Sequence, residues 1–523
     1  MMRAILSVVG LAALLAGPVP AQEQVQAKPS PKPVPVGEPA PPAAEGSKEE
    51  AIRESVVKIY STMRGPDVIR PWLKQSPSEA SGTGVIIEGK RILTNAHVIN
   101  YASQVYVEPN QSGEKIAATV RFVAPEIDLA VLELADEAFF EKRPPLARAE
   151  KLPEIKESVI VYGYPTGGTT LSITKGIVSR IEFVGYGGHT QGLRIQIDAA
   201  VNPGNSGGPA LVDDRMIGLV NSGIRGADNI GYIIPTEEVD IFLRDVADGK
   251  YDNKPMMHDQ LQTLENEALR ARLGFAKKAV GMVVREPDVK EDSYPLKKWD
   301  VITKLGDHEV DNVGMSKLRD NLRVGFRYFL QVLAKDGKVP ATVVRDGKEL
   351  AIELPVPVRA DELVRPLQGR YPSYFVYGPL VFSAASAEFL TAVDRLQSFF
   401  GAIGSPLATR RGDRVAFPDE ELVVVSSPMF PHKIGKGYSN PLAKVIKEIN
   451  GVKIKNLRQL VETLRDSKEK YITISFDDRN SETIVFDRQE VLKATDEILS
   501  DNSVRQQASD DILPVWTAKP PAP

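Results

Sequence analysis

Ser206 stands between glycines in the stretch Asn202–Pro209, which reads Asn-Pro-Gly-Asn-Ser-Gly-Gly-Pro. Proline and glycine fix a tight loop, and glycine lets a substrate come close to bare backbone N–H groups. The nucleophile of an acyl transfer needs such an exposed hydroxyl. It also needs amides aimed at the developing oxyanion, and those of Gly204 and Ser206 are the candidates. An ordinary glycine-rich turn is the alternative, because a short motif alone is only a hypothesis.

A serine hydroxyl is a weak nucleophile and needs a general base. The chain has five histidines, and His97 follows an apolar run that predicts a strand end. Asp128 opens another apolar run, so we expect it at the edge of the core. Each residue taken singly is more often structural than catalytic. The order His97, Asp128, Ser206 within one β-rich region is nevertheless that of a chymotrypsin-type triad.

The segment Gly204–Gly208 also satisfies Gly-x-Ser-x-Gly, the nucleophile elbow of α/β-hydrolases. In that elbow the serine precedes the histidine and joins a strand to a helix. Here the histidine comes first, and residues 210–212 and 216–220 predict two strands around Asp213-Asp214. The context therefore favours a β-barrel.

The elements that must position these residues are short β-rich runs separated by turn residues, between residues 49 and 254. They predict a sandwich or barrel and not alternating β/α units. Two related modules follow, at 257–357 and 370–490. In both, two short strands precede a predicted helix, at Gly314–Leu322 and at Leu457–Leu464. The segment Val343–Leu350 predicts a hairpin with an Asp-Gly turn. Residues 501–523 predict a disordered tail.

The N-terminus predicts export. A basic start, an apolar run at 4–17 and small residues before Gln22 form a signal peptide at 1–21, cleaved near Ala21. An uncleaved anchor is disfavoured because the run is short. Residues 22–48 form a Pro/Ala-rich linker. No other stretch reaches the ~18 apolar residues that a membrane helix needs.

Composition excludes several classes of function. The 523 residues suggest about three domains on a length prior. A formal charge of -4 argues neither for nucleic acid nor for a polyanion-binding surface, and we expect no nucleic-acid partner. The absence of cysteine excludes thiol catalysis, disulfides and Cys-based zinc sites. We expect neither a cofactor nor a metal.

With these motifs the chain resembles the Deg/HtrA serine proteases. The resemblance rests on Thr-Asn-Ala-His-Val around His97, Asp-Leu-Ala-Val-Leu from Asp128 and the Ser206 octapeptide, with Gly82-Thr83-Gly84 before them. The two later modules look like PDZ domains, so the resemblance covers roughly residues 50–490. The second module looks most like the plant and bacterial Deg-nine-type branch.

The resemblance implies a mainly β fold, with a chymotrypsin-like double β-barrel followed by two α+β PDZ-like domains. It implies that His97 is general base and then acid, that Asp128 orients it, and that Ser206 forms an acyl-enzyme. It further implies an oxyanion hole and a wall of the primary specificity pocket that prefers small aliphatic residues. The hole comprises Gly204, Asn205 and Ser206, and the wall Ile217, Gly218, Leu219, Val220, Asn221 and Ser222. Three glycine-containing stretches match regulatory loops of the family: Thr166–Thr170, Phe183–Gly192 and Asn221–Asn229.

In the first module, a four-residue stretch matches the PDZ loop whose backbone N–H groups hold a peptide C-terminus. Its residues are Arg272, Leu273, Gly274 and Phe275. Trp299 stands where such modules carry glycine. A tryptophan does not take a positive φ cheaply, so we expect that turn to differ. In the second module Pro379 lacks an N–H, which favours a role in assembly or regulation over peptide capture.

Together these features predict an exported, periplasmic, ATP-independent serine endopeptidase. Its substrates would be unfolded polypeptides, its first PDZ domain would bind peptide C-termini, and it would form a homo-oligomer built on trimers. One alternative is a chaperone or scaffold whose protease domain is held inactive by its loops. The other is an ester hydrolase with the serine before the histidine.

Overall fold

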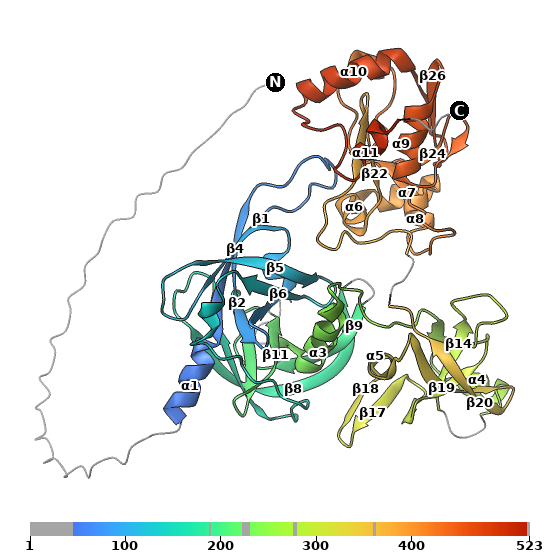
Figure 1. Ribbon diagram of the computed structural model, residues 1–523. Coiled ribbons are helices and arrows are strands. Elements are labelled where there is room, and N and C mark those ends of the chain that lie inside the picture. The colour runs from blue at the N-terminus through green and yellow to red at the C-terminus, as the bar shows by residue number, and fades with distance from the viewer. Residues whose placement is uncertain (1–44, 188–189, 222–230, 276–279, 359–361, 520–523) are drawn as a thin grey trace, which may run out of the picture. The chain divides into compact units, whose positions relative to one another are not determined.

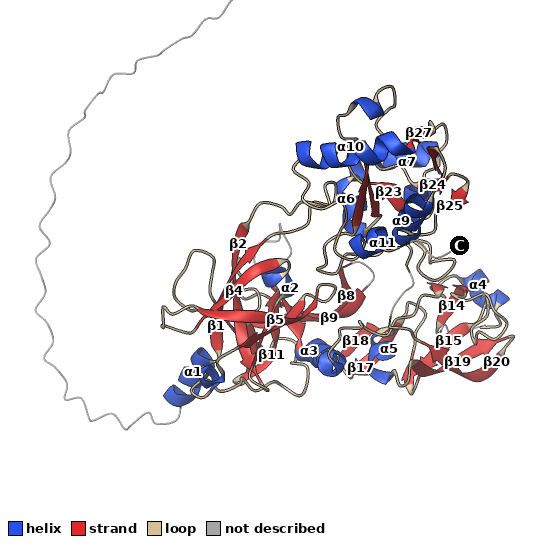
Figure 2. Cartoon of the chain, turned by 45° about the horizontal axis from the view of Figure 1, so that its top comes forward, coloured by secondary structure: helices blue, strands red, loops and turns tan. Residues whose placement is uncertain are grey.

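Two closed six-stranded barrels carry the first part of the folded chain (Figure 1). The computed structural model describes residues 45–187, 190–221, 231–275, 280–358 and 362–519. The predicted signal peptide and nearly all of the predicted linker lie outside these residues. Figure 2 shows that the barrel region consists mostly of strands, with short helices such as α2 and α3 between them.

The first barrel has the strand order β1-β2-β3-β6-β5-β4. Helix α1 (Glu45–Glu54) precedes it, the one-turn helix α2 (Ala96–Ile99) follows β3, and a 3₁₀ turn (Glu137–Phe140) follows β6. Its strands are β1 (Val56–Met63), β2 (Ser78–Ile87), β3 (Arg91–Thr94), β4 (Ala102–Glu108), β5 (Ile116–Ala124) and β6 (Leu129–Leu134).

The second barrel has the strand order β10-β11-β12-β9-β8-β7. Helix α3 (Thr236–Asp245) and a 3₁₀ turn (Val246–Asp248) follow its last strand. Its strands are β7 (Ser158–Gly163), β8 (Ser172–Gly187), β9 (Thr190–Ile197), β10 (Pro209–Val212), β11 (Arg215–Asn221) and β12 (Gly231–Pro235).

Alternation of side chains builds the core of the second barrel. In β9 the buried residues Leu193, Ile195 and Ile197 point inward, while Arg194 and Gln196 are only half-buried. Successive strand residues face opposite sides of a sheet, so this pattern gives one apolar face. The expected strands around Asp213 and Asp214 are confirmed, because both residues have positive φ, at 48° and 60°, in the turn between β10 and β11. The barrels confirm the expected mainly β, chymotrypsin-like fold.

The first module is a sheet of order β13-β14-β15-β19-β20, with β16 paired to β15, plus a separate β17–β18 hairpin. The predicted Asp-Gly hairpin is confirmed between β19 and β20, where Arg345 pairs with Lys348. The elements are β13 (Gln260–Gln262), α4 (Glu267–Arg272), β14 (Met282–Glu286), β15 (Val301–Leu305), β16 (His308–Glu309), β17 (Met315–Arg319), β18 (Leu322–Gly325), α5 (Tyr328–Leu333), β19 (Lys338–Arg345) and β20 (Lys348–Pro355).

The predicted helix at Gly314–Leu322 is wrong, because this segment forms the β17–β18 hairpin. Arg319 pairs with Leu322 across the two-residue turn Asp320-Asn321, and Met315 pairs with Gly325. Asp and Asn favour turns because their side chains bond to nearby backbone. Burial also alternates with the period of a strand, since Ser316 is buried and Lys317 is exposed.

The turn at Trp299 also departs from expectation, because this residue does take a positive φ, of 77°. Neighbouring bonds hold the strained turn in place. The Trp299 N–H donates to the Val284 carbonyl at 2.8 Å, and Arg345 donates to both carboxylate oxygens of the buried Asp300.

The second module combines the sheets β21-β22-β23 and β25-β24-β26-β27 with several helices. The helix predicted at Leu457–Leu464 is confirmed as α9. The elements are β21 (Tyr374–Tyr377), β22 (Leu380–Ala384), α6 (Ala387–Ala392), α7 (Gln397–Ile403), α8 (Pro406–Thr409), β23 (Val423–Val425), β24 (Ile446–Ile449), β25 (Val452–Lys453), α9 (Leu457–Asp466), β26 (Tyr471–Phe476), β27 (Ile484–Asp487), α10 (Arg488–Asp501) and α11 (Leu513–Thr517), with 3₁₀ turns at Asp394–Leu396 and Lys433–Gly435.

The predicted disordered tail is wrong for residues 501–519. Ala508 forms a bridge with Phe375 of β21, and the Gln507 carbonyl accepts from the Val376 N–H at 2.8 Å. Helix α11 follows, and the Trp516 ring lies 5.0 Å from that of Phe375. The tail is mostly polar in sequence, but a few of its apolar side chains complete the core of the second module.

Candidate active site

His97 and Asp128 are brought together by the pairing of two strands in the first barrel. Strands β3 and β6 run antiparallel, with Thr94 opposite Ala130. The residues just after β3 and just before β6 are therefore neighbours. Nδ1 of His97 lies 2.7 Å from Oδ2 of Asp128, and the His97 N–H donates to Oδ1 at 2.8 Å.

The environment of this pair suits a base that must meet a substrate. The His97 side chain is 46% exposed, whereas that of Asp128 is 17% exposed. Asp128 has a φ of 56°, and its carbonyl accepts from the Asn95 side chain at 2.9 Å. With its hydrogen on Nδ1, the ring would donate to the carboxylate and could accept a proton at Nε2.

Ser206 lies in the loop between β9 and β10, in the second barrel, and is 3% exposed. Backbone bonds attach the loop on both sides. The Thr83 N–H donates to the Ser206 carbonyl at 2.9 Å, and the Gly207 N–H donates to the Val220 carbonyl at 2.9 Å. Gly207 has a φ of 84°, and a Cβ there would lie 2.2 Å from the Thr83 carbonyl oxygen. Only glycine fits this position.

Ser206 and His97 line the same cavity, of about 720 Å³, together with Gly204. A neighbouring cavity of about 400 Å³ is lined by His97, Asp128 and Asn221. His97 thus lines both cavities, one with Ser206 and the other with Asp128. The serine comes from the second barrel, and the histidine and aspartate come from the first.

Thr83 supports the predicted oxyanion stretch, a role that the sequence did not assign to it. Its hydroxyl donates to the Gly204 carbonyl at 2.8 Å and accepts from the Tyr164 N–H at 2.9 Å. Thr83 is fully buried, and it belongs to the Gly82-Thr83-Gly84 motif. A threonine between two glycines in an apolar strand was the available signal. Asn205 is also buried, and its Oδ1 has no hydrogen-bond partner among the described residues.

The predicted wall of the specificity pocket is mostly core. Ile217, Leu219 and Val220 are at most 2% exposed, and Gly218 is also buried. Of this stretch, Asn221 lines a cavity, the one it shares with His97 and Asp128. Ser222 lies outside the described residues.

The predicted carboxylate loop of the first module is the C-terminal end of α4. The N–H groups of Leu273, Gly274 and Phe275 donate to the carbonyls of Leu269, Ala271 and Arg270. Gly274 has a φ of 82°, as expected of a glycine that ends a helix. In this conformation the three amides do not form an open row for a carboxylate.

In the second module the corresponding turn is also occupied. The Gly378 N–H donates to the Thr495 hydroxyl of α10 at 2.9 Å, and a Cβ at Gly378 would lie 2.3 Å from a methyl carbon of Val491. This arrangement agrees with the expectation that Pro379 weakens the turn as a carboxylate cradle.

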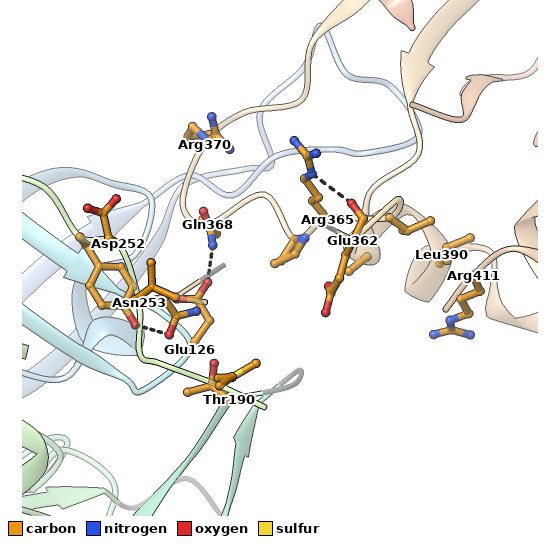
Figure 3. Close-up of a pocket in the computed structure, with 16 residues that line it drawn as sticks. Glu126, Thr190, Asp252, Asn253, Glu362, Arg365, Gln368, Arg370, Leu390 and Arg411 are labelled. Carbon is orange, nitrogen blue, oxygen red and sulfur yellow. Dashed lines mark hydrogen bonds between the residues drawn. The ribbon is translucent and has the colours of Figure 1, made fainter. Parts of the chain in front are cut away.

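A separate cavity of about 420 Å³ is shown in Figure 3, where Gln368 donates to Glu126 at 2.6 Å. None of the three predicted triad residues lines it. Within the part of the chain that the structure describes, no cluster of acidic and histidine side chains is placed to hold a metal ion. No helix in the same residues is long and apolar enough to cross a membrane.

Comparison with known proteins agrees with this arrangement. Residues 82–219 match the model of a trypsin-like peptidase domain, and residues 365–511 match that of a PDZ domain. The chain is 33% identical over 468 residues to protease Do-like 4, mitochondrial, of Arabidopsis thaliana, covering 88% of this chain and 86% of the relative. It is also 33% identical over 464 residues to protease Do-like 2, chloroplastic, of the same plant, covering 88% and 75%.

Among solved structures, the HtrA-type protease AlgW with a tripeptide aligns with a TM-score of 0.46 and 24% identity, over 60% of this chain and 97% of that one. The two plant relatives are similar along nearly the whole folded chain, through the barrels and the modules behind them. The chain belongs to the Deg/HtrA, or Do-like, family of serine endopeptidases, which join a trypsin-like protease domain to PDZ domains.

Proposed function

We propose that Ser206, His97 and Asp128 form the catalytic triad of an exported, ATP-independent endopeptidase for unfolded polypeptides. The observation that carries the proposal is the 2.7 Å contact between His97 Nδ1 and Asp128 Oδ2, in a histidine that shares its cleft with Ser206. The family's serine endopeptidase activity supplies the reaction class.

Each group in this scheme has a defined task. Ser206 Oγ attacks the carbonyl carbon of the scissile bond while His97 Nε2 takes the hydroxyl proton. Asp128 stabilises the imidazolium, and the amides of Gly204 and Ser206 bind the oxyanion. The C–N bond then breaks, and His97 gives its proton to the departing amine. Water attacks the acyl-enzyme by the same route and releases Ser206.

The proposal extends to specificity, peptide binding and assembly. The likeness to the family supports a preference for small aliphatic side chains, although β11 itself is mostly core. PDZ modules support recognition of peptide C-termini. In the first module this requires the last turn of α4 to release the amides of Leu273, Gly274 and Phe275, whose acceptors are helix carbonyls. We also propose that the protein forms a homo-oligomer built on trimers and that a signal peptide is cleaved near Ala21.

Digestion of unfolded casein by the wild type and by Ser206→Ala tests the proposal. We expect the wild type to produce peptides without ATP and the variant to produce none, while both melt at the same temperature. If both preparations are inert yet suppress aggregation equally, the protein is a chaperone or scaffold. If ester hydrolysis survives His97→Ala, the reaction does not use this triad.

Light scattering and N-terminal sequencing test the remaining parts. A mass that is a multiple of three chains and a mature N-terminus near Gln22 would support them. A monomer would contradict the assembly, and an intact Met1 in the exported fraction would contradict cleavage.

A further inference from the structure

Lys58 of β1 is a buried cation at the edge of the active-site cleft. It is 6% exposed, and it lines the cavity that also contains His97 and Ser206. Its Nζ donates to the Gly168 carbonyl at 2.7 Å and lies 4.7 Å from the centre of the Tyr60 ring. Burying an ammonium is costly unless it forms strong compensating contacts. Among the described residues no carboxylate forms an ion pair with Lys58, so its position needs another explanation.

The bond to Gly168 joins the two barrels. Lys58 belongs to the first barrel, whereas Gly168 lies in the segment between β7 and β8 of the second. The Gly168 N–H donates to the Pro165 carbonyl at 2.9 Å, which closes a tight turn over residues 165–168. Lys58 therefore fixes one end of a short turn from across the cleft.

The other contact of this turn is with the nucleophile loop. The Thr166 N–H donates to the Pro203 carbonyl at 2.7 Å. Gly204 packs directly against the same turn, because a Cβ there would lie 2.4 Å from both Thr166 N and the Tyr164 carbonyl oxygen. The orientation of the Pro203–Gly204 peptide is thus set by the turn that Lys58 holds.

That orientation decides where the Gly204 N–H points. The Pro203 carbonyl and the Gly204 N–H belong to one planar trans peptide, so they point in opposite directions. A carbonyl held toward Thr166 directs the N–H away from the turn, toward the cleft that Gly204 lines with Ser206. If the peptide rotated, a carbonyl oxygen would face the developing oxyanion in place of a donor.

We propose that Lys58 is a positioning residue for the oxyanion hole. Its ammonium binds the Gly168 carbonyl, the turn at residues 165–168 binds the Pro203 carbonyl, and the Gly204 N–H is thereby aimed at the reacting carbonyl. This inference rests on the proposed function. It adds a residue that belongs neither to the triad nor to the oxyanion hole itself.

Tyr60 completes the environment of Lys58. Its hydroxyl donates to Glu108 at 2.6 Å, and burial, followed by that hydrogen bond, raises the pKa of the phenol to about 12. The ring therefore stays neutral and presents its face to the ammonium. Lys115 also lies over this ring, at 3.9 Å, but it is exposed and has no hydrogen bond to the turn at residues 165–168. It is the matched control for loss of a positive charge from the cleft.

The test compares Lys58→Met, Lys58→Arg and Lys115→Met in the full chain, with a fluorogenic peptide and a peptide aldehyde. The aldehyde forms a tetrahedral adduct with the serine and so reports on oxyanion binding, which a noncovalent peptide does not. Full loss of one oxyanion donor lowers kcat by about 10²–10³. We expect Lys58→Met to lower kcat by at least about tenfold and to lower the affinity for the aldehyde by a similar factor. KM should change by no more than about twofold. Arginine should restore part of both losses, and Lys115→Met should lose clearly less kcat and aldehyde affinity than Lys58→Met.

Melting curves separate positioning from folding. Methionine has nearly the length of lysine and is apolar, so Lys58→Met should fold. The inference is overturned if folded Lys58→Met keeps wild-type kcat and aldehyde affinity, or if Lys115→Met loses as much. It is also overturned if kcat falls with the melting temperature while aldehyde affinity is unchanged. An inactive wild type would count against the proposed function, which is a different outcome.

Discussion

Both carboxylate oxygens of Asp128 bind His97, one through the imidazole Nδ1 at 2.7 Å and one through the backbone N–H at 2.8 Å. The aspartate therefore fixes the orientation of the ring. In the proposed triad such a carboxylate keeps the hydrogen on Nδ1, so that Nε2 can act as the base.

Replacing Asp128 with asparagine should preserve the fold and lower kcat by about 10⁴, because an amide favours the wrong tautomer of His97. Steady-state kinetics with a fluorogenic peptide measure the loss. Glu133→Gln is the control, since this half-exposed acid of β6 forms only a 3.7 Å ion pair with Arg121. An Asp128→Asn enzyme within tenfold of the wild type would contradict the assigned role.

Gly207→Ala should destabilise the protease domain by about 2–4 kcal/mol, from strain at a positive φ and from overpacking. A new Cβ would lie 2.2 Å from the Thr83 carbonyl oxygen and 2.4 Å from the Thr94 hydroxyl oxygen. Gly113→Ala isolates the strain, because Gly113 has a φ of 68° and no atom within 4 Å of a built Cβ. We expect Gly113→Ala to lower the free energy of unfolding, measured in urea, by only about 1 kcal/mol. Equal costs for the two variants would show that the close contact in the nucleophile loop is unimportant.

Stability should depend on pH through Glu237 of α3. Burial raises the pKa of this carboxyl from 4.5 to about 7 in the folded protein. Because the pKa is raised in the folded state, the stabilising contribution of this carboxyl to the free energy of unfolding is fully present below about pH 4.5. It is lost as pH rises toward 7. The free energy of unfolding of Glu237→Gln should therefore match that of the wild type near pH 4 and exceed it by up to about 3 kcal/mol above pH 7.

Melting temperatures of wild type and Glu237→Gln across pH 4–8 test this expectation. The exposed Glu114→Gln serves as the control and should show no such dependence. A difference between Glu237→Gln and wild type that stays constant with pH would contradict the assignment.

The C-terminal segment should be needed for the second module to fold. Trp516 lies 5.0 Å from Phe375 and 6.3 Å from Tyr377, and Arg465 of α9 donates to the Val515 carbonyl at 2.6 Å. We expect Trp516→Ala to lower the stability of this module by about 2–4 kcal/mol and to expose the tail to trypsin. Lys519→Ala, beyond α11, is the control. Ready cleavage of the native wild type after Arg505 would contradict the folded tail.

The sequence predicted the relation of His97 to Asp128 because both stand at the ends of apolar strands in a recognisable chain order. It predicted turns at Asp213-Asp214 and Asp346-Gly347 because local turn chemistry dominates there. The prediction failed at Gly314–Leu322, where the expected parallel between the two modules outweighed the Asp320-Asn321 turn signal.

Other stretches of sequence suit two structures. Leu273-Gly274-Phe275 predicts a carboxylate loop, and Gly274 also ends helix α4, so peptide binding at this loop stays a prediction. The tail is polar on average, but four apolar residues, Ala508, Ile512, Val515 and Trp516, pack on distant strands. Lys58 was missed, although a lysine within the apolar Val56–Tyr60 segment is itself a signal of a buried cation that needs compensating contacts.

We propose that Ser206 is a nucleophile activated by His97. Fluorophosphonate labelling of the native protein, followed by peptide mapping, tests this role most directly. We expect one labelled residue, Ser206, with labelling abolished in Ser206→Ala and strongly slowed in His97→Ala. A label on any other residue, or full labelling of Ser206→Ala, would contradict it.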